Sequence, residues 1–251
     1  MSITLAALNV YPIKGCAGIA LTEATLTETG LAWAGVNDRH WVLINAQGRF
    51  LSQRELPRMA CIQTRMADGL LHVDAPGMDT LPLTIAEQAA SDARASVSIW
   101  QDQLLAATES PQADAWFSRF LGQPTRLLRF APEAQRLSDP LYTEGMRAPY
   151  QFADAFALLI TNQASLTELN QRLPAPVDMN RFRANLVLDG LEAFDEDHAS
   201  ELRIGSAGVR ITKTCARCTV PGVDPQTGEF SADVPDALAS FRRREQGVLF
   251  G

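Results

Sequence analysis

The sequence of 251 residues has few cysteines, few histidines and almost no lysine. Its four cysteines are too few for a disulfide scaffold, so each has to be judged as a thiol or as a ligand. No apolar run reaches the roughly 18 residues that cross a bilayer. No basic residue precedes Lys14, and no signal-peptide pattern opens the chain. We therefore expect a soluble, cytoplasmic protein with no membrane partner.

Two nucleotide-binding motifs are absent as well. The chain contains neither a Walker A pattern nor a GxGxxG fingerprint, which argues against a P-loop enzyme or a Rossmann dehydrogenase. The net charge of −7 repels nucleic acid unless a local basic patch overcomes it, so we expect no nucleic-acid partner. With 46% hydrophobic and 20% charged residues, the composition is that of an ordinary globular protein with a real core.

Short apolar runs separated by glycine, proline and aspartate dominate the first half of the chain. This pattern predicts a mainly β, α+β protein with a barrel or sandwich. A glycine-containing turn at residues 45–48 should join two of the strands into a hairpin. The expected strands are residues 3–13, 19–27, 41–44, 49–52, 61–66, 70–73, 81–85 and 97–107.

Helical spacing appears at residues 111–121, where alanine and aromatic residues recur every three or four positions. The sequence Gly122-Gln123-Pro124 ends this helix and predicts a boundary between domains 1–122 and 123–251. In the second domain we expect a loop at 147–154, helices at 162–173 and 235–245, and strands at 125–130, 158–161, 182–188 and 202–211.

The strongest chemical signal is the segment KTCARC at residues 213–218, followed by DPQTG at 224–228. It holds two cysteines three positions apart, Cys215 and Cys218, with Arg217 between them. Cationic neighbours lower the pKa of a thiol and favour the thiolate. A thiolate is a soft ligand that suits a transition metal. The segment therefore predicts a reactive or metal-ligating thiol.

Both lysines of the chain, Lys14 and Lys213, lie two residues before a cysteine. Lys14 precedes Gly15 in the segment YPIKGC, where a turn would let an ammonium and a backbone N–H approach one anion. A plain turn with a solvated lysine is the alternative. Arg39 and Arg183 are further cationic candidates, although a single arginine is more often a surface ion-pair partner.

Three other interpretations of the two C-terminal cysteines stay open. A CxxC pair can be a redox dithiol, but no thioredoxin-like βαβ pattern surrounds this one. It can also be half of a zinc site, but no histidine lies near it, and Cys16 and Cys61 are not a second pair. Either cysteine can instead be a small buried hydrophobic residue.

Five segments occur in the order seen in the MOSC family with its N-terminal β-barrel domain: YPIKGC, NDRHW, FADAFALLITNQASLTELN, NRFRANLVL and CARCTVPGVDPQTG. The sequence resembles bacterial MOSC proteins and the mitochondrial amidoxime reducing component over essentially the full chain. The resemblance implies an N-terminal β-barrel domain at 1–122 and a MOSC β-barrel with flanking helices at 123–251. Relatives continue beyond the last residue here, so a truncated MOSC domain is expected.

The resemblance also implies a molybdenum–molybdopterin cofactor in the cleft between the two domains. In the family, the second cysteine of the CxxC segment ligates molybdenum at the catalytic centre, which corresponds to Cys218. Gly15 and Ala216 stand where relatives often carry serine, so only their backbones can contact the cofactor. The implied cofactor-binding residues are Lys14, Gly15, Arg39, Ala155, Phe156, Arg183, Ala216 and Arg217.

The activity implied by the resemblance is reduction of N-hydroxylated compounds, such as amidoximes and N-hydroxylated base analogues, by removal of oxygen at the cofactor. A separate flavin or iron–sulfur reductase would supply the electrons, because the chain has no C-x4-C-x2-C run. Two other functions stay open. The same domain ends the molybdenum cofactor sulfurases, so Cys218 could carry a persulfide in a sulfur or cofactor carrier. The other open function is that of a non-catalytic thiol or anion-binding module.

Overall fold

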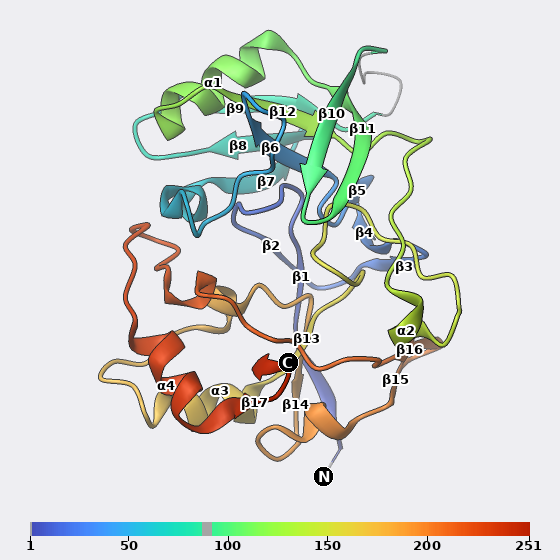
Figure 1. The fold of residues 1–251 in the computed structure, drawn as a ribbon, viewed down its shortest axis with the longest axis vertical. Helices are drawn as coiled ribbons and strands as arrows, with labels where there is room; N and C mark the ends of the chain where they lie inside the picture. The colour runs from blue at the N-terminus through green and yellow to red at the C-terminus, as the bar shows by residue number, and fades with distance from the viewer. Residues whose placement is uncertain (1, 87–91) are drawn as a thin grey trace.

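The structure, a computed structural model, describes residues 2–86 and 92–251, which form two lobes (Figure 1). The upper lobe in that view holds α1 and strands β6 to β12, and the lower lobe holds α3 and α4. The first strand, β1 (Thr4–Val10), belongs to the sheet of the lower lobe. It pairs antiparallel with β14 (Leu186–Asp189) and with β2 (Ile19–Leu21), and β14 pairs in parallel with β13 (Ile160–Asn162). This pairing places the residues that follow β1 next to segments from the C-terminal half of the chain.

The upper lobe is built from two sheets and one helix. α1 (Pro111–Leu121) begins at Ser110, whose hydroxyl accepts a hydrogen bond from the N–H of Ala113 at 3.1 Å, and ends at Gly122 with φ 71°. Its buried Phe117 packs in a core with Trp41. One sheet has the order β10-β11-β12-β6 and the other β7-β8-β9. Their strands are β10 (Arg94–Ile99), β11 (Asp102–Thr108), β12 (Thr125–Arg129), β6 (Trp41–Asn45), β7 (Gln63–Ala67), β8 (Leu70–Asp74) and β9 (Leu81–Thr84).

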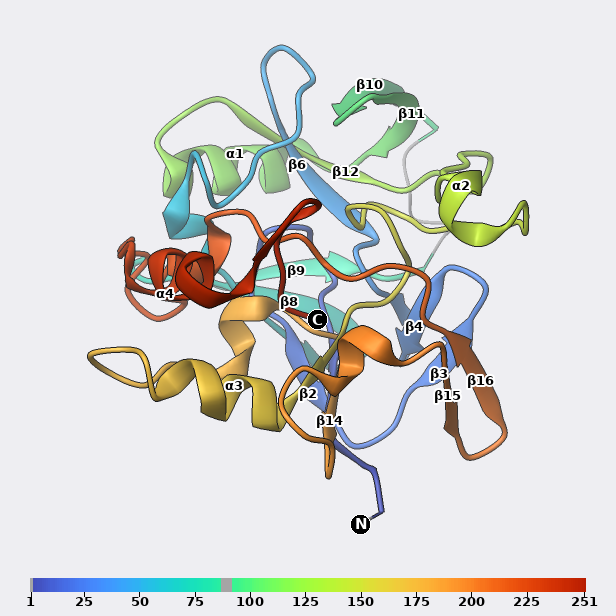
Figure 2. The ribbon, with the colours of Figure 1, turned by 60° about the horizontal axis from the view of Figure 1, so that its bottom comes forward.

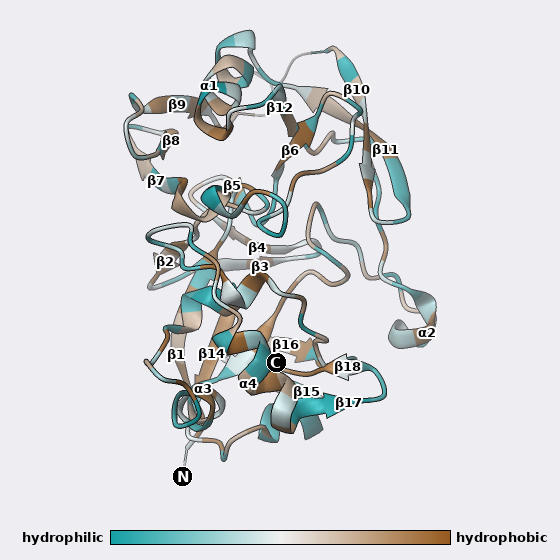
Figure 3. Cartoon of the chain, turned by 60° about the vertical axis from the view of Figure 1, so that its left-hand side comes forward, coloured by the Kyte–Doolittle hydropathy of each residue, from teal (hydrophilic) through white to brown (hydrophobic). Residues whose placement is uncertain are grey.

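The remaining elements are short. Figure 2 shows β15 and β16 on the same side of the molecule as β3 and β4, and α3 and α4 on the opposite side. α3 and α4 pack through Leu166 and Leu238 against Phe182 and Phe250. Within the short hairpin β17–β18 only β17 is hydrophilic (Figure 3), and Val248 of β18 packs against the same core. The helices are α2 (Pro140–Thr143), α3 (Gln163–Asn170) and α4 (Asp233–Arg242), with 3-10 turns η1 (Pro57–Cys61), η3 (Met179–Phe182), η4 (Asp195–His198) and η5 (Val220–Gly222). The strands are β3 (Thr25–Thr27), β4 (Gly30–Trp33), β5 (Val36–Asn37), β15 (Glu201–Ile204), β16 (Ala207–Arg210), β17 (Arg243–Arg244) and β18 (Gly247–Val248).

The predicted mainly β, α+β fold class is confirmed, and the helix at 111–121 has the predicted bounds. The predicted strands at 97–107 and 202–211 are wrong, because each region folds back as a hairpin. The chain reverses at Trp100, with φ 52°, and at Gly205, with φ 58°. The predicted strand at 19–27 is split into β2 and β3.

Two further predictions need correction. The strand expected at 182–188 begins only at Leu186, because η3 ends at Phe182 and Arg183 adopts a left-handed conformation with φ 60°. The turn at 45–48 is present, with the N–H of Gly48 donating to the carbonyl of Asn45 at 3.0 Å. The returning segment at 49–52 is not a full strand, because it makes only isolated bridges. None of the described helices is both long and apolar enough to cross a bilayer.

Candidate functional site

A cavity of about 620 Å³ lies between segments of the first half of the chain and segments of the second half. The first half contributes the turn after β1 and the tip of the β10–β11 hairpin, and the second half contributes residues from Ser138 onward. All nine residues predicted to hold a cofactor line this cavity: Lys14, Gly15, Arg39, Ala155, Phe156, Arg183, Ala216, Arg217 and Cys218.

The cavity is basic although the whole protein is acidic. Eight of its lining residues are lysine or arginine and three are aspartate or glutamate, an excess of five positive charges in a chain whose net charge is −7. Both lysines of the chain are among them. Such a concentration of one sign in a concave site attracts anions. The cations are Lys14, Arg39, Arg54, Arg147, Arg183, Arg210, Lys213 and Arg217, and the acids are Glu28, Asp154 and Glu196.

Lys14 is placed by the turn that follows β1. Its backbone N–H donates to the carbonyl of Trp41 at 2.8 Å, and the next residue, Gly15, has φ 85°. A Cβ at Gly15 would lie 2.5 Å from the Cε of Met59, so both the backbone conformation and the space favour glycine. The Lys14 ammonium is paired with Asp154 at 2.5 Å. Burial lowers the pKa of Lys14, and the Asp154 carboxylate opposes that effect.

Arg39 and Arg183 lie beside one aromatic ring, that of Tyr11. Their guanidinium carbons are 4.4 Å and 4.6 Å from its centre. Arg39 donates to Asn185 Oδ1 and to the carbonyl of Arg183, both at 2.9 Å, and Arg183 donates to the carbonyl of Cys16 at 2.6 Å. Burial lowers the pKa of Arg183, and the neighbouring Arg39 charge lowers it further. Tyr11 belongs to YPIKGC, yet nothing in the sequence marks it as the contact between two arginines.

The KTCARC segment is held by the last residues of the chain. The N–H of Arg217 donates to the carbonyl of Val248 at 2.7 Å, and Ala216 forms a β-bridge with Leu249. The Arg217 side chain donates to the carbonyl of Phe182 at 3.0 Å and contacts Cys215 Sγ at 3.2 Å. Its Nε is buried with no hydrogen-bond partner among the described residues. An orphaned donor on a cavity-lining arginine is the kind of group that a bound ligand satisfies.

The four cysteines differ in exposure. Cys16 and Cys61 are buried, Cys215 is half-buried and Cys218 is exposed, and all four are free thiols. Burial raises the pKa of Cys16 to about 12. Cys218 is therefore not a buried hydrophobic residue, and it lines the basic cavity. Within residues 2–86 and 92–251, no three His, Cys, Asp or Glu residues group closely enough to hold a metal by themselves.

The DPQTG segment forms a turn that attaches the second half of the chain to the first. Asp224 accepts hydrogen bonds from the N–H groups of Gln226 and Thr227 at 2.8 and 3.1 Å and from Arg181 at 2.8 Å. Burial would raise the pKa of Asp224, but these donors outweigh it and hold the pKa low. A Cβ at Gly228 would lie 3.1 Å from the backbone of Arg58 in η1. The motif thus has a structural role beside the site.

Several residues that sequence reasoning missed also form the site. Trp100, at the tip of the β10–β11 hairpin, donates from its indole nitrogen to Asp154 at 3.1 Å, and its ring lies 5.1 Å from that of Phe50. Asp154 stands immediately before the predicted Ala155 and Phe156, and the Ser138 hydroxyl donates to the carbonyl of Ala155 at 2.8 Å. No local motif distinguishes Trp100 or Phe50, since they meet through tertiary folding alone.

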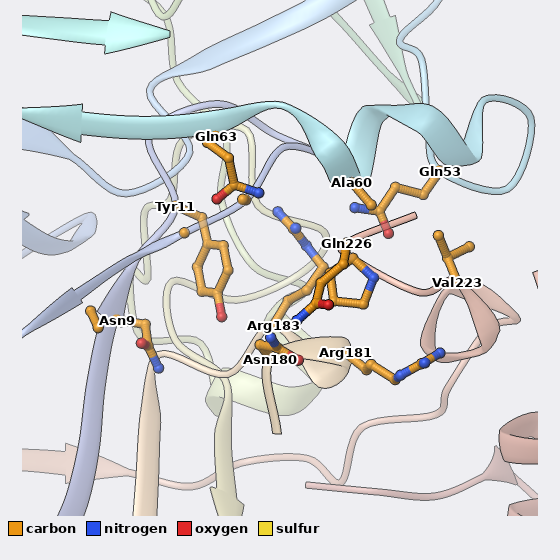
Figure 4. A pocket seen from close by; sticks show the side chains of 14 residues that line it. Asn9, Tyr11, Gln53, Ala60, Gln63, Asn180, Arg181, Arg183, Val223 and Gln226 are labelled. Carbon is orange, nitrogen blue, oxygen red and sulfur yellow. The ribbon is translucent and has the colours of Figure 1, made fainter. Parts of the chain in front are cut away.

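A second, smaller cavity of about 340 Å³ is shown in Figure 4. Gln53 and Arg183 line both cavities. Figure 4 shows Tyr11 and Arg183 among amide side chains that include Asn9, Asn180 and Gln226. Arg183 therefore lies among polar side chains in the smaller cavity as well as in the larger one.

Comparison with known proteins identifies the family. The family model described as the MOSC N-terminal beta barrel domain matches residues 2–124, and that of the MOSC domain matches residues 147–251. This chain belongs to the MOSC family. The resemblance stated from the sequence is thus confirmed. The domain boundary at residue 122 stays a prediction, and strand pairing crosses it, because β12 pairs with β6 and β1 with β14.

Two kinds of relative match nearly the whole chain of this MOSC protein. The human protein "Mitochondrial amidoxime reducing component 2" is 33% identical over 243 residues, which are 95% of this chain and 72% of that protein. Human "Mitochondrial amidoxime-reducing component 1" is 31% identical over 254 residues, or 96% of this chain and 72% of that protein. The "Molybdenum cofactor sulfurase" of rice is 30% identical over 271 residues, which cover 99% of this chain but 32% of the sulfurase.

Proposed function

We propose that this protein binds a molybdenum–pterin cofactor through Cys218 and reduces N-hydroxylated compounds. The observation that carries the proposal is that nine scattered residues, expected from the family resemblance to bind this cofactor, line one basic cavity with an exposed thiol. The names of the amidoxime reducing components point to the same reaction class. In that reaction an N–OH compound takes up two electrons and two protons and yields the N–H compound and water.

The residues present fit a phosphorylated, sulfur-coordinated cofactor. A phosphate dianion needs several fixed cations, and each charge-assisted hydrogen bond to it stabilises the complex by about 1.5–3 kcal/mol. Lys14, Arg39 and Arg183 would bind the phosphate, and the orphaned Nε of Arg217 would gain a partner. Cys218 would supply the thiolate. When bound, the cofactor supplies the two-electron chemistry.

The chain's own residues then have distinct tasks. The buried Asp38, which pairs with Arg39 at 2.5 Å, and the Tyr11 ring, which contacts both guanidiniums, hold Arg39 and Arg183 side by side, so that the site is formed before an anion arrives. Gly15 and Ala216 offer backbone groups to the cofactor without side chains in the way. The pairing of residues 215–217 with the last residues of the chain fixes the backbone next to Cys218. Fixed donors need little reorganisation when an anion binds.

Metal content tests the proposal. Protein produced in a host that makes the cofactor should contain about one molybdenum per chain, and Cys218→Ala should lose it. Cys215→Ala, a matched change three residues away, should keep it. Reduction of a panel of N-hydroxy compounds with an artificial electron donor should follow the metal. Metal-free wild-type protein, or metal retained in Cys218→Ala, would contradict the proposal.

A sulfur or cofactor carrier is the second candidate. It is favoured by the exposure of Cys218 and by the similarity to the rice sulfurase. In that case Cys218 would hold a persulfide, and mass spectrometry would show an added sulfur atom on it in protein that contains no molybdenum.

We further propose that a separate flavin or iron–sulfur reductase donates the electrons. Two of the four cysteines are buried in the core, and the sequence has no ferredoxin-type cysteine run. The cytoplasmic location expected from the sequence stays a prediction.

A further inference from the structure

One side of the basic cavity has a different character from the rest. There two aromatic rings, Phe50 and Trp100, lie 5.1 Å apart at an angle of 55°, next to the carboxylate of Asp154. Trp100 is 50% exposed, and all three residues line the cavity. An exposed indole does not bind phosphate, and the Asp154 carboxylate can at most orient Lys14 for that task.

The position of Trp100 is fixed by the chain around it. The N–H of Phe50 donates to the carbonyl of Ser98 at 3.1 Å, and the N–H of Ser98 donates to the carbonyl of Gly48 at 2.8 Å. These bonds join the β10–β11 hairpin to the segment that carries Phe50. Trp100 also has a left-handed backbone, with φ 52°, which is rare for a bulky residue and is maintained only by its surroundings.

Asp154 has one oxygen engaged and one available. Its Oδ1 accepts from Lys14 at 2.5 Å and from Trp100 at 3.1 Å, while no hydrogen bond to Oδ2 is present among the described residues. The side chain is 70% exposed. The partial loss of water around Asp154 would raise its pKa, but the Lys14 ammonium and the two hydrogen bonds outweigh it and lower the pKa. The group is therefore an anion at neutral pH, with a free acceptor directed to solvent.

We propose that Trp100, Phe50 and Asp154 form a substrate-recognition subsite that selects flat N-hydroxylated amidines. The exposed Trp100 ring stacks on the planar substrate, and the buried Phe50 ring, only 6% exposed, packs against Trp100. Asp154 Oδ2 accepts hydrogen bonds from the substrate's N–H groups, most strongly when the amidine is a cation. The proposal rests on the proposed function and adds the residues that decide which N-hydroxy compounds are accepted. Arg54, whose guanidinium lies 4.7 Å from the Trp100 ring centre, would be displaced from the ring or share it.

Binding of benzamidine, a flat aromatic amidine, tests the subsite without turnover. Calorimetric titration of the purified protein should show binding, and Asp154→Asn should weaken it about tenfold or more, the effect of losing a hydrogen bond between charged groups. Trp100→Ala should weaken it about threefold to tenfold through lost stacking. Glu28→Gln, another cavity-lining carboxylate, and Leu105→Ala, another exposed residue of the same hairpin, should bind as the wild type does.

Kinetics then separate this inference from the proposed function. In the metal-loaded enzyme, Asp154→Asn should raise KM for benzamidoxime with little change in kcat, and should leave KM for an aromatic N-oxide without N–H groups unchanged. Unchanged benzamidine affinity in Asp154→Asn, equal loss in Glu28→Gln, or no binding by the wild type would overturn the subsite even if molybdenum and activity are present. Absence of molybdenum would overturn the proposed function and leave the calorimetric result standing.

Discussion

The segments at residues 11–16 and 213–218 look alike in sequence but use their residues differently. Each places a lysine two positions before a cysteine, and both lysines line the cavity. Cys16 is completely buried. In the second segment the matching Cys215 is half-buried, and Cys218, three residues further on, is exposed in the cavity wall. The first segment thus contributes its cation and keeps its sulfur in the core, and the second contributes its sulfur. The same short pattern therefore says that a segment reaches the site, but not which atom acts there.

Thiol reactivity should show this difference most strongly. Because burial raises the pKa of Cys16 to about 12, its thiolate fraction at pH 8 is on the order of a thousandfold below that of an ordinary thiol. Iodoacetamide labelling of the folded, metal-free protein, followed by peptide mass spectrometry, should modify Cys218 at once and Cys16 only after unfolding. Comparable labelling rates at Cys16 and Cys218 would contradict the different roles of the two sulfurs.

The second-largest difference is expected between the two lysines, in their contribution to anion binding. Lys14 is buried and fixed beside Asp154, whereas the Lys213 ammonium is exposed and lies 4.0 Å from the centre of the Tyr142 ring. Lys14→Met should weaken binding of pyrophosphate to the metal-free protein by about tenfold to a hundredfold, the effect of one charge-assisted hydrogen bond. Lys213→Met should have a smaller effect, of a few-fold. Calorimetric titration measures both, and an equal loss in the two variants would argue for a diffuse electrostatic effect.

The protein should tolerate a serine at position 216 but lose stability with a serine at position 15. Gly15 has φ 85°, and a Cβ there would push the end of the Met59 side chain aside, so Gly15→Ser should lower the free energy of unfolding by about 2 kcal/mol, mainly through backbone strain. Ala216 is exposed in an extended bridge, so Ala216→Ser should change it by less than about 0.5 kcal/mol. Urea unfolding of both variants decides this. A fully stable Gly15→Ser protein would mean that the turn can rearrange.

The smallest expected difference concerns the stability contributed by the two sulfurs. Cys16→Ala removes a fully buried atom from the core and should cost about 1–2 kcal/mol. Cys218→Ala removes an exposed atom and should cost less than about 0.5 kcal/mol. Thermal unfolding of metal-free protein gives both values. If Cys218→Ala is the more destabilising change, the thiol has a structural role.

Local sequence predicts some elements of the fold fully and others not at all. The bounds of α1 follow from signals that agree, namely a serine cap, helical spacing and a terminal glycine. The β15–β16 hairpin also carries a usable signal, a Gly205 turn inside the apolar run. The β10–β11 hairpin carries none, because its turn is made by Trp100. The pairing of β1 with β14 joins residues far apart in the chain, which no periodicity reveals.

The site divides in the same way. The resemblance predicts the cofactor residues, and the physical reading of Lys14 and of the KTCARC segment agrees with it. Tyr11, Trp100 and Asp154 are not predictable, because their contacts arise where the two lobes meet. Lys14 alone would be assigned to anion binding from the sequence. In the structure its ammonium is paired with the carboxylate of Asp154. Such opposition between neighbours becomes visible only in three dimensions.

Anomalous scattering at the molybdenum absorption edge, from crystals of the metal-loaded protein, tests the central claim most directly. We expect one strong peak inside the basic cavity, within bonding distance of Cys218 Sγ, with phosphate density next to Lys14, Arg39 and Arg183. A peak bonded to Cys215 instead, a peak outside the cavity, or phosphate density remote from these three cations would contradict it.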